Sequence, residues 1–220
     1  MNIRLILSVL AMFFSSFLIA QLSTSVYLGV GPAKSLNSNS EFTPKAIDNR
    51  DFSLQPVKQL MTYTGGVAVF HTFPSNFLIG GELQYQTSTT EYALREISGD
   101  SEYNTSMTVN ASEHRIALPV SVGVHLGNFT AYSGVSANMI VSKSSNFDQF
   151  DSFNDTGSNF YMGWHAGLGY HLGPVEFEVR YTQDFKNYGS GYEIAKKDMI
   201  FYGNRSRWLF LVKYDLLYSR

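Results

Sequence analysis

Apolar residues alternate with polar residues or glycine between Met162 and Phe185, on both sides of a Gly173-Pro174 pair. Side chains of a β-strand point alternately to the two faces of a sheet, so this segment predicts a hairpin with one apolar and one polar face. The apolar face could contact either the core of a soluble protein or lipid. Its residues are Met162, Trp164, Ala166, Leu168 and Tyr170 before the pair, and Val175, Phe177, Val179 and Tyr181 after it.

The same alternation recurs along the chain and predicts eight strands. In the fourth, Ile116, Val120 and Val124 share the apolar parity. Most of the segments match the roughly 9–11 residues that a tilted strand needs to cross a bilayer. The predicted strands cover residues 24–30, 63–73, 77–87, 113–126, 129–141, 159–172, 175–185 and 205–217.

The connections between these strands alternate in length. Short turns are expected at 74–76, 127–128 and 173–174. Long polar loops are expected near 31–62, 88–112, 142–158 and 186–204. An even number of strands with alternating short and long connections is the topology of an outer-membrane barrel, which has short periplasmic turns and longer extracellular loops.

A soluble eight-stranded barrel, apolar inside and polar outside, would show the same alternation, so composition has to separate the two. Charged residues make up only 15% of the chain, against about 25% in soluble domains. The polar parity holds mostly Gly, Ser, Thr, Gln and Tyr, which suits a crowded lumen. The fold class predicted is therefore all-β: an eight-stranded antiparallel up-and-down transmembrane β-barrel. Aromatic residues near the strand ends predict its two interfacial girdles, with Phe73, Phe77, Phe129 and Tyr170 by the short turns and Tyr63, Phe160 and Tyr181 by the long loops.

Residues 1–20 have the layout of a secretory signal peptide, with Arg4 before an apolar stretch and cleavage expected after Ala20. A retained N-terminal anchor helix is the alternative. With residues 1–20 removed as a signal peptide, residues 21–220 would form the barrel domain, which would be exported to the bacterial outer membrane. The chain has no cysteine, which excludes disulfides, thiolate metal sites, a cysteine nucleophile and a lipoprotein anchor. Its net charge of −2 gives no indication of a nucleic-acid partner.

Four stretches of the chain resemble the PorT-like outer-membrane barrel family of Bacteroidetes. They are GGELQYQT, HRIALPVSVGVHLG, MGWHAGLGYHLGPVEFEVRY and NRSRWLFLVKYDL, and together they reach over most of residues 60–217. The resemblance implies an eight-stranded barrel, and most members of that family have no assigned chemistry. The part that its founding member plays in protein secretion is not carried over. The chain departs from proteobacterial barrels at its end, where LLYSR replaces the usual terminal aromatic residue.

Seven charged residues fall on the predicted inward parity. An eight-stranded barrel is just wide enough for side chains to fill, and a buried ion without a partner costs several kcal/mol. These charges therefore predict a salt-bridge network that plugs the lumen, while a narrow ion or small-solute channel lined by them is the alternative. Glu176 and Glu178 could also be a pair of catalytic carboxylates, although a packed lumen gives substrate no access. The seven are Glu82, Arg115, Glu176, Glu178, Arg180, Lys213 and Asp215.

The acidic loop near residues 146–160 offers Asp148, Asp151 and Asp155 as oxygen ligands for calcium, but their spacing misses the EF-hand pattern. A solvated binding loop at the cell surface is the favoured interpretation. Neither His114 nor His165 has Ser-His-Asp spacing beside it, so no catalytic residue, enzyme activity, metal or cofactor is predicted. The function expected is structural or loop-mediated interaction, with outer-membrane lipid and envelope proteins as partners. The alternatives are a channel, an accessory component of a secretion system, and a membrane-embedded hydrolase.

Overall fold

The computed structural model describes residues 21–36, 51–97, 106–145, 153–154, 159–188, 193–194, 197–198 and 201–216 of the 220-residue chain. The predicted signal peptide, 1–20, lies outside these residues, as do Asp148, Asp151 and Asp155 of the acidic loop. No helix of the described residues is long and apolar enough to cross a membrane.

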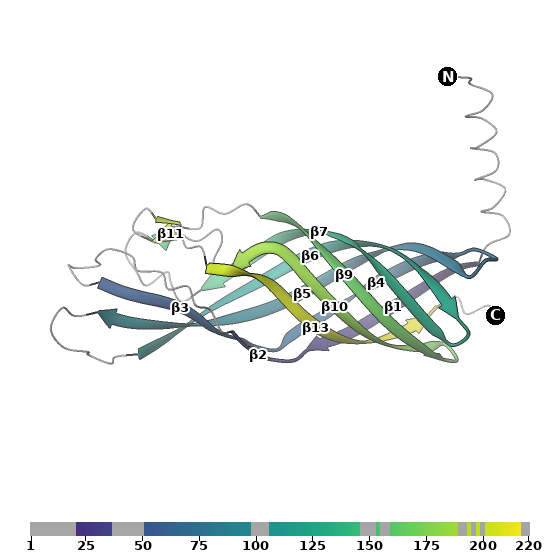
Figure 1. The fold of residues 1–220 in the computed structure, drawn as a ribbon, viewed down its shortest axis with the longest axis horizontal. Coiled ribbons are helices and arrows are strands. Elements are labelled where there is room, and N and C mark those ends of the chain that lie inside the picture. Colours follow the sequence, from purple (N-terminus) through teal and green to yellow (C-terminus); the bar gives the residue numbers. More distant parts are fainter. Residues whose placement is uncertain are drawn as a thin grey trace, which may run out of the picture.

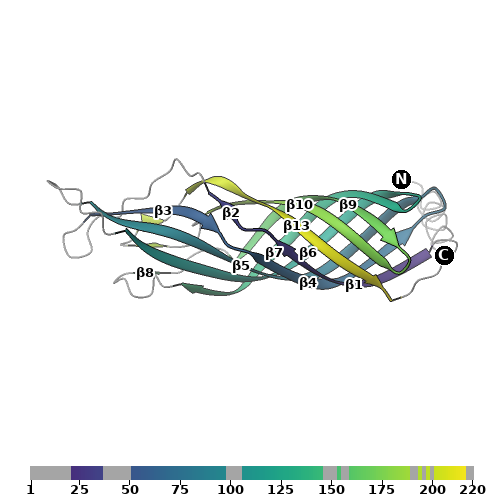
Figure 2. The same ribbon diagram turned by 90° about the horizontal axis from the view of Figure 1, so that it is seen from below.

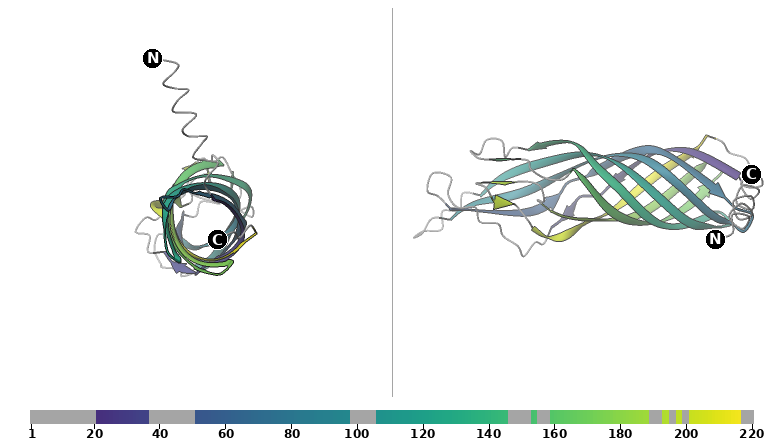
Figure 3. Two further views of the ribbon diagram at one scale, coloured as in Figure 1. Left: turned by 90° about the vertical axis from the view of Figure 1, so that its right-hand side faces the viewer. Right: turned by 90° about the horizontal axis from the view of Figure 1, so that it is seen from above.

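Eight strands form a closed antiparallel ring (Figure 3, left). Each strand pairs with its neighbours in this ring, and the last strand pairs with the first through Val26 and Tyr214. The predicted eight-stranded up-and-down barrel is therefore confirmed. In ring order the strands are β1 (Gln21–Gly31), β4 (Thr62–Thr72), β5 (Phe77–Ile97), β6 (Ser106–Leu126), β7 (Phe129–Ser145), β9 (Phe160–Leu172), β10 (Val175–Tyr188) and β13 (Phe201–Asp215).

Three tight turns join β4 to β5, β6 to β7 and β9 to β10 at one end of the barrel (Figure 1, right). Each contains one residue in the left-handed region, with φ values of 63° at Asn76, 65° at Gly127 and 63° at Gly173. Asn and Gly are the residues that adopt this conformation most readily. The sequence places these residue types where the chain reverses, and the three predicted short turns are confirmed.

All four predicted long loops are shorter than expected, because strands continue into them, most of all in the first two. β5 and β6 are 21 residues each and pair from Phe77↔Val124 up to Arg95↔Ser106. β3 (Asp51–Gln59) lies inside the predicted loop 31–62. It pairs with the far part of β5, on the same side of β5 where β4 pairs nearer the tight turns. The outward apolar alternation ends before the hydrogen bonding between strands does, so the pattern marked the apolar span and not the strand ends.

Four short strands complete the described elements. β2 (Lys34–Ser35) pairs with β3, so the sheet has ten strands while its ring has eight. β8 (Phe153–Asn154), β11 (Glu193–Ile194) and β12 (Lys197–Asp198) form a separate small sheet. The extended ends of β3, β5 and β6 project at the end of the barrel opposite the tight turns (Figures 1 and 2).

The outward face of the ring is apolar over its middle. On β6, Leu118, Val120 and Val122 are 53%, 53% and 47% exposed, and comparable exposed apolar residues lie on all seven of the other ring strands. Aromatic contacts mark both ends of this belt: Phe129–Tyr170 near the tight turns, with ring centroids 5.0 Å apart, and Tyr181–Trp208 at 5.1 Å towards the other end. A continuous apolar belt between aromatic girdles is the surface of a transmembrane barrel, since water would disfavour so large an exposed apolar area.

Glycines in the lumen wall make room for aromatic rings. A Cβ atom added at Gly167 would overlap the ring of Tyr132, and Gly66 and Gly80 stand in the same relation to Tyr27 and Phe70. The rings therefore lie directly against bare backbone on the inside of the barrel. Tyr27 and Tyr132 are 3% and 6% exposed, so these rings fill space that a larger wall residue would need.

This packing predicts unequal effects of two glycine substitutions within strands. Gly167→Ala should lower the free energy of unfolding by about 1–3 kcal/mol, because the new methyl group displaces the buried Tyr132 ring. Gly81→Ala is the matched control, since the nearest atom to its added Cβ is Pro119 O at 3.7 Å. Urea unfolding of the protein in lipid vesicles measures both, and equal stability of the two variants would contradict the packing.

Candidate functional site

Inward-facing charges gather in the lumen because two-residue spacing repeats along two adjacent strands. β10 contributes Glu176, Glu178, Arg180 and Asp184, and β13 contributes Arg205, Arg207 and Lys213. Residues two apart on a strand lie on the same face, so each strand presents a column of charge to the interior. These columns contact charged residues of β5 and β6 on the opposite wall. The resulting contacts fall into three groups along the barrel axis: a mouth near the tight turns, a central cluster, and an upper cluster farthest from the tight turns.

The central cluster is organised by a bidentate ion pair across the lumen. Arg180 Nη1 and Nη2 donate to Glu82 Oε2 and Oε1, both at 2.8 Å. Three strands of the ring separate β5 from β10 in either direction, so this pair spans the barrel from wall to wall. Arg180 is 1% exposed and Glu82 4%, and bidentate pairing matches the planar guanidinium to the carboxylate.

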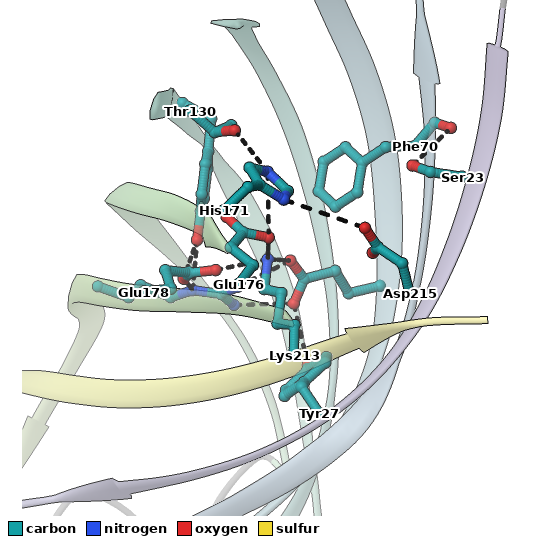
Figure 4. Close-up of polar contacts among 12 residues, drawn as sticks. Ser23, Tyr27, Phe70, Thr130, His171, Glu176, Glu178, Lys213 and Asp215 are labelled. Atoms are coloured by element: carbon teal, nitrogen blue, oxygen red, sulfur yellow. Dashed lines mark hydrogen bonds and ion pairs between the residues drawn. The ribbon is translucent and has the colours of Figure 1, made fainter. Parts of the chain in front are cut away.

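The remaining groups of the central cluster neutralise and orient this pair. Glu178 accepts from Arg180 Nε at 2.6 Å and pairs with Lys213 Nζ at 2.5 Å. Lys213 also lies 3.7 Å from Glu176 Oε2 and 3.9 Å from Glu82 Oε1 (Figure 4). Two tyrosine hydroxyls complete the cluster: Tyr27 donates to Glu82 at 2.9 Å, and Tyr132 donates to Glu178.

The upper cluster contains a second cross-lumen pair. Arg205 on β13 is bidentate to Glu113 on β6, with Nη2 to Oε1 at 3.1 Å and Nη1 to Oε2 closer still. These strands are also separated by three strands in either direction around the ring. Just below, Arg115 donates to Asp184 at 2.8 Å and to Tyr161 at 2.6 Å, and Arg207 donates to the same oxygen of Asp184 at 2.5 Å.

The mouth near the tight turns holds imidazole and hydroxyl groups. Thr130 Oγ1 lies 2.9 Å from His125 Nδ1 and 3.0 Å from His171 Nε2. Asp215 Oδ2 is 4.0 Å from His171 Nδ1, on the side away from Thr130 (Figure 4). This is the order of a hydroxyl–imidazole–carboxylate triad, but 4.0 Å is too long for the hydrogen bond by which the carboxylate would orient the ring. The triad is therefore incomplete.

The structure divides the seven predicted lumenal residues among these three groups. Arg115 lies in the upper cluster and Asp215 at the mouth, while the remaining five form the central cluster: Glu82, Glu176, Glu178, Arg180 and Lys213. Four further inward charges were not predicted, namely Glu113, Asp184, Arg205 and Arg207. They share the parity of Arg115, Arg180 and Lys213, so the alternation of β6, β10 and β13 already carried the signal.

Metal binding and acid–base catalysis both depend on how the described lumenal side chains are grouped. No group of three or more His, Asp or Glu side chains among the described residues is placed to hold a metal ion. Ser121 Oγ and His165 Nε2 are 2.7 Å apart, but these residues are only 1% and 2% exposed. What the arrangement can do chemically is hold the walls of the barrel together.

Several solved structures resemble this chain in comparison with known proteins. No family model matches the chain, and no curated protein matches it. The chain is similar to the backbone structure of the Yersinia pestis outer membrane protein Ail in a phospholipid bilayer nanodisc, with a TM-score of 0.38 and 13% identity. The alignment covers 89% of this chain and 100% of that one. At this TM-score the likeness carries no argument, and the fold rests on the strand pairing described above.

Removing Arg180 should be costly because it leaves two buried carboxylates short of a cation. We expect Arg180→Ala to lower the free energy of unfolding by about 3–5 kcal/mol. The control is Lys34→Ala, since Lys34 is an exposed cation that donates to Ser206 at 3.1 Å; its effect should stay within about 0.5 kcal/mol. Thermal and urea unfolding in detergent measure both, and a tolerated Arg180→Ala would show that water solvates the central cluster.

Proposed function

We propose that this chain is a non-enzymatic outer-membrane barrel with a lumen plugged by its own side chains, which has a structural or interaction role at the cell surface. The observation that carries the proposal is the pair of ion bridges across the lumen, Arg180–Glu82 in the centre and Arg205–Glu113 above it. Both are bidentate, and each joins strands on opposite walls.

The geometry of these bridges supports the proposed closure of the lumen. An eight-stranded barrel has an interior that side chains can fill, so an ion crossing the whole lumen would have to pass two wall-to-wall bridges at different levels. Passing through would require breaking charge pairs that are at most 7% exposed. Tyr27 and Tyr132 add aromatic bulk at the central level, which supports a plug over the alternative of a narrow channel.

The apolar belt supports the proposed location in the outer membrane. Barrels cross membranes with every backbone hydrogen bond made between strands, and this ring has no open edge within its belt. Export by residues 1–20 remains part of the proposal, as does membership of the PorT-like family, which rests on the four resembling stretches. A role as accessory to a secretion system is the corresponding alternative.

The strands beyond the belt support a role in interaction. β3 and the far halves of β5 and β6 continue the sheet away from the tight turns, with Thr90↔Ala111 and Tyr92↔Val109 still in register. In this outer part Leu54, Tyr92 and Val109 are at most 1% exposed, so it is packed and not merely extended. We propose that this stiff projection presents the extracellular loops to other envelope proteins, and that the tight turns face the periplasm.

The plug is tested by conductance. The full chain in planar bilayers should show no steady single-channel current, whereas Glu82→Ala combined with Arg180→Ala should raise the current by removing the central bridge. Large, steady conductance of the unmodified protein would instead support the channel alternative. Far-UV circular dichroism of the double variant, matched to the parent, shows that the comparison is between two folded barrels.

The orientation is tested with single cysteines, because the chain has none of its own. A membrane-impermeant maleimide should label Thr108→Cys, at the exposed far end of β6, on intact cells. Ser75→Cys, in the exposed turn between β4 and β5, should react only after the outer membrane is permeabilised. The opposite labelling pattern would reverse the topology and move the interaction surface to the periplasm.

The hydrolase alternative depends on one observation, the contact of Thr130 with two imidazoles at the mouth. It would require Asp215 to close the 4.0 Å gap to His171. A fluorophosphonate probe, which modifies activated hydroxyl nucleophiles, should leave Thr130 unlabelled if the proposed non-enzymatic role is right. Labelling that disappears in Thr130→Val would establish a nucleophile there.

A further inference from the structure

Between the central cluster and the Arg205–Glu113 bridge, three neighbouring inward side chains form a row across three adjacent strands. Thr182 on β10 is in register with Arg207 on β13 and with His165 on β9. Directly paired residues of antiparallel strands have Cβ atoms about 4.5–5.5 Å apart, so the three polar groups face one region of the lumen. His165 and Arg207 are 2% and 6% exposed.

Each member of this row has a buried polar atom that no described residue satisfies. These atoms are His165 Nδ1, Thr182 Oγ1 and both Nε and Nη1 of Arg207. Arg207 uses only Nη2, which donates to Asp184 at 2.5 Å. Buried polar groups are ordinarily hydrogen-bonded, so a cluster of unsatisfied atoms in one row is unusual and indicates that something else contacts them.

The row consists of groups that can donate hydrogen bonds. The two arginine nitrogens are obligatory donors, and the threonine hydroxyl can donate as well. Ser121 Oγ lies 2.7 Å from His165 Nε2; if that hydroxyl donates to Nε2, the neutral ring carries its proton on Nδ1. A ligand that fits such a row must accept several hydrogen bonds at once.

Charge indicates that the ligand is an anion and not water alone. Arg115 and Arg207 both donate to Oδ2 of Asp184, so two guanidiniums share one carboxylate oxygen. The neighbouring carboxylate, Glu113, is already bidentate to Arg205. Water could accept the free hydrogen bonds of Arg207, but it would leave the upper cluster with one positive charge in excess, because Asp184 serves both Arg207 and Arg115.

We propose that a small monovalent anion of halide size binds in the lumen, held by Arg207 Nε and Nη1 and by the hydroxyl of Thr182, with His165 beside it. The site lies under the Arg205–Glu113 bridge and above the Arg180 cluster. Its size is limited by the burial of Arg207 and Asp184, which excludes bulky organic anions. Arg207 and Arg115 share the carboxylate of Asp184, and the bound ion supplies the second negative charge that these two guanidiniums need.

The test is the dependence of unfolding temperature on chloride at constant ionic strength, with sodium gluconate replacing sodium chloride for the full chain in neutral detergent. A ligand that binds only the folded state raises the unfolding temperature in a saturable way. The unmodified protein should show this rise. Arg207→Gln should show none, whereas Lys58→Gln, which removes an exposed cation from β3, should respond like the parent.

A second variant keeps the test informative if Arg207→Gln folds poorly. Thr182→Val preserves side-chain shape and removes one donor, so the chloride midpoint should rise about tenfold, as for the loss of a hydrogen bond to a charged group. Crystals grown in sodium bromide should show an anomalous peak within hydrogen-bonding distance of Arg207. No chloride response in the unmodified protein, or an equal response in both lumen variants and the parent, would overturn the proposal. Because these readouts do not involve current, failure here is distinguishable from failure of the plug.

Discussion

The Arg180–Glu82 ion pair across the lumen is the interaction around which the interior is organised. Closing eight strands into a ring leaves a space that can hold side chains but little bulk water, so every inward charge must find its counter-charge on another strand. Arg180 pairs with the carboxylates of Glu82 and Glu178. Lys213 lies close to the same two carboxylates and also to that of Glu176. The central level is thus a cross-brace between β5, β10 and β13, and the same contacts would form the proposed plug.

Glycine and tyrosine act together to make this brace geometrically feasible. Charged side chains from opposite walls can meet only if the other inward positions leave room, which is why Gly66, Gly167 and Gly169 lie on the lumen side. The ring of Tyr132 lies over Gly167, and its hydroxyl reaches Glu178, so one residue fills volume and satisfies a buried carboxylate. The carboxylate of Glu176 occupies the corresponding space at Gly169. The glycines that weaken strand propensity elsewhere are therefore required here by the tyrosine rings and the carboxylate that they face.

The sequence predicted the ring well, because parity is a local property of each strand. Alternation in Ile116–Val124 and in Trp208–Leu216 identified the outward face, and the three tight turns fixed the neighbours of six strands. The sequence could not predict which charged residues form ion pairs across the lumen. Pairing across the lumen depends on strand tilt and stagger, so Arg115 lies beside Asp184 and not beside Glu178, although both carboxylates belong to the same column of β10. Strand ends beyond the belt were also missed, since the apolar residues there, such as Tyr92 and Val109, are buried on the inner face and do not continue the outward apolar pattern.

Charge is distributed unevenly along the lumen, and this asymmetry follows from the same constraint. Near the tight turns, carboxylates lie beside an imidazole: His171 is within 4.0 Å of both Glu176 and Asp215, and all three side chains retain some exposure, so water can contribute to their solvation. In the upper cluster Arg115 and Arg207 share Asp184 at less exposed positions, where both arginine side chains are 5% exposed against 8–14% for the three near the tight turns. Uncompensated charge is tolerable at a mouth and costly in an enclosed layer. Excess negative charge can therefore remain at the open end, whereas excess positive charge in the enclosed layer demands a counter-ion from outside the chain.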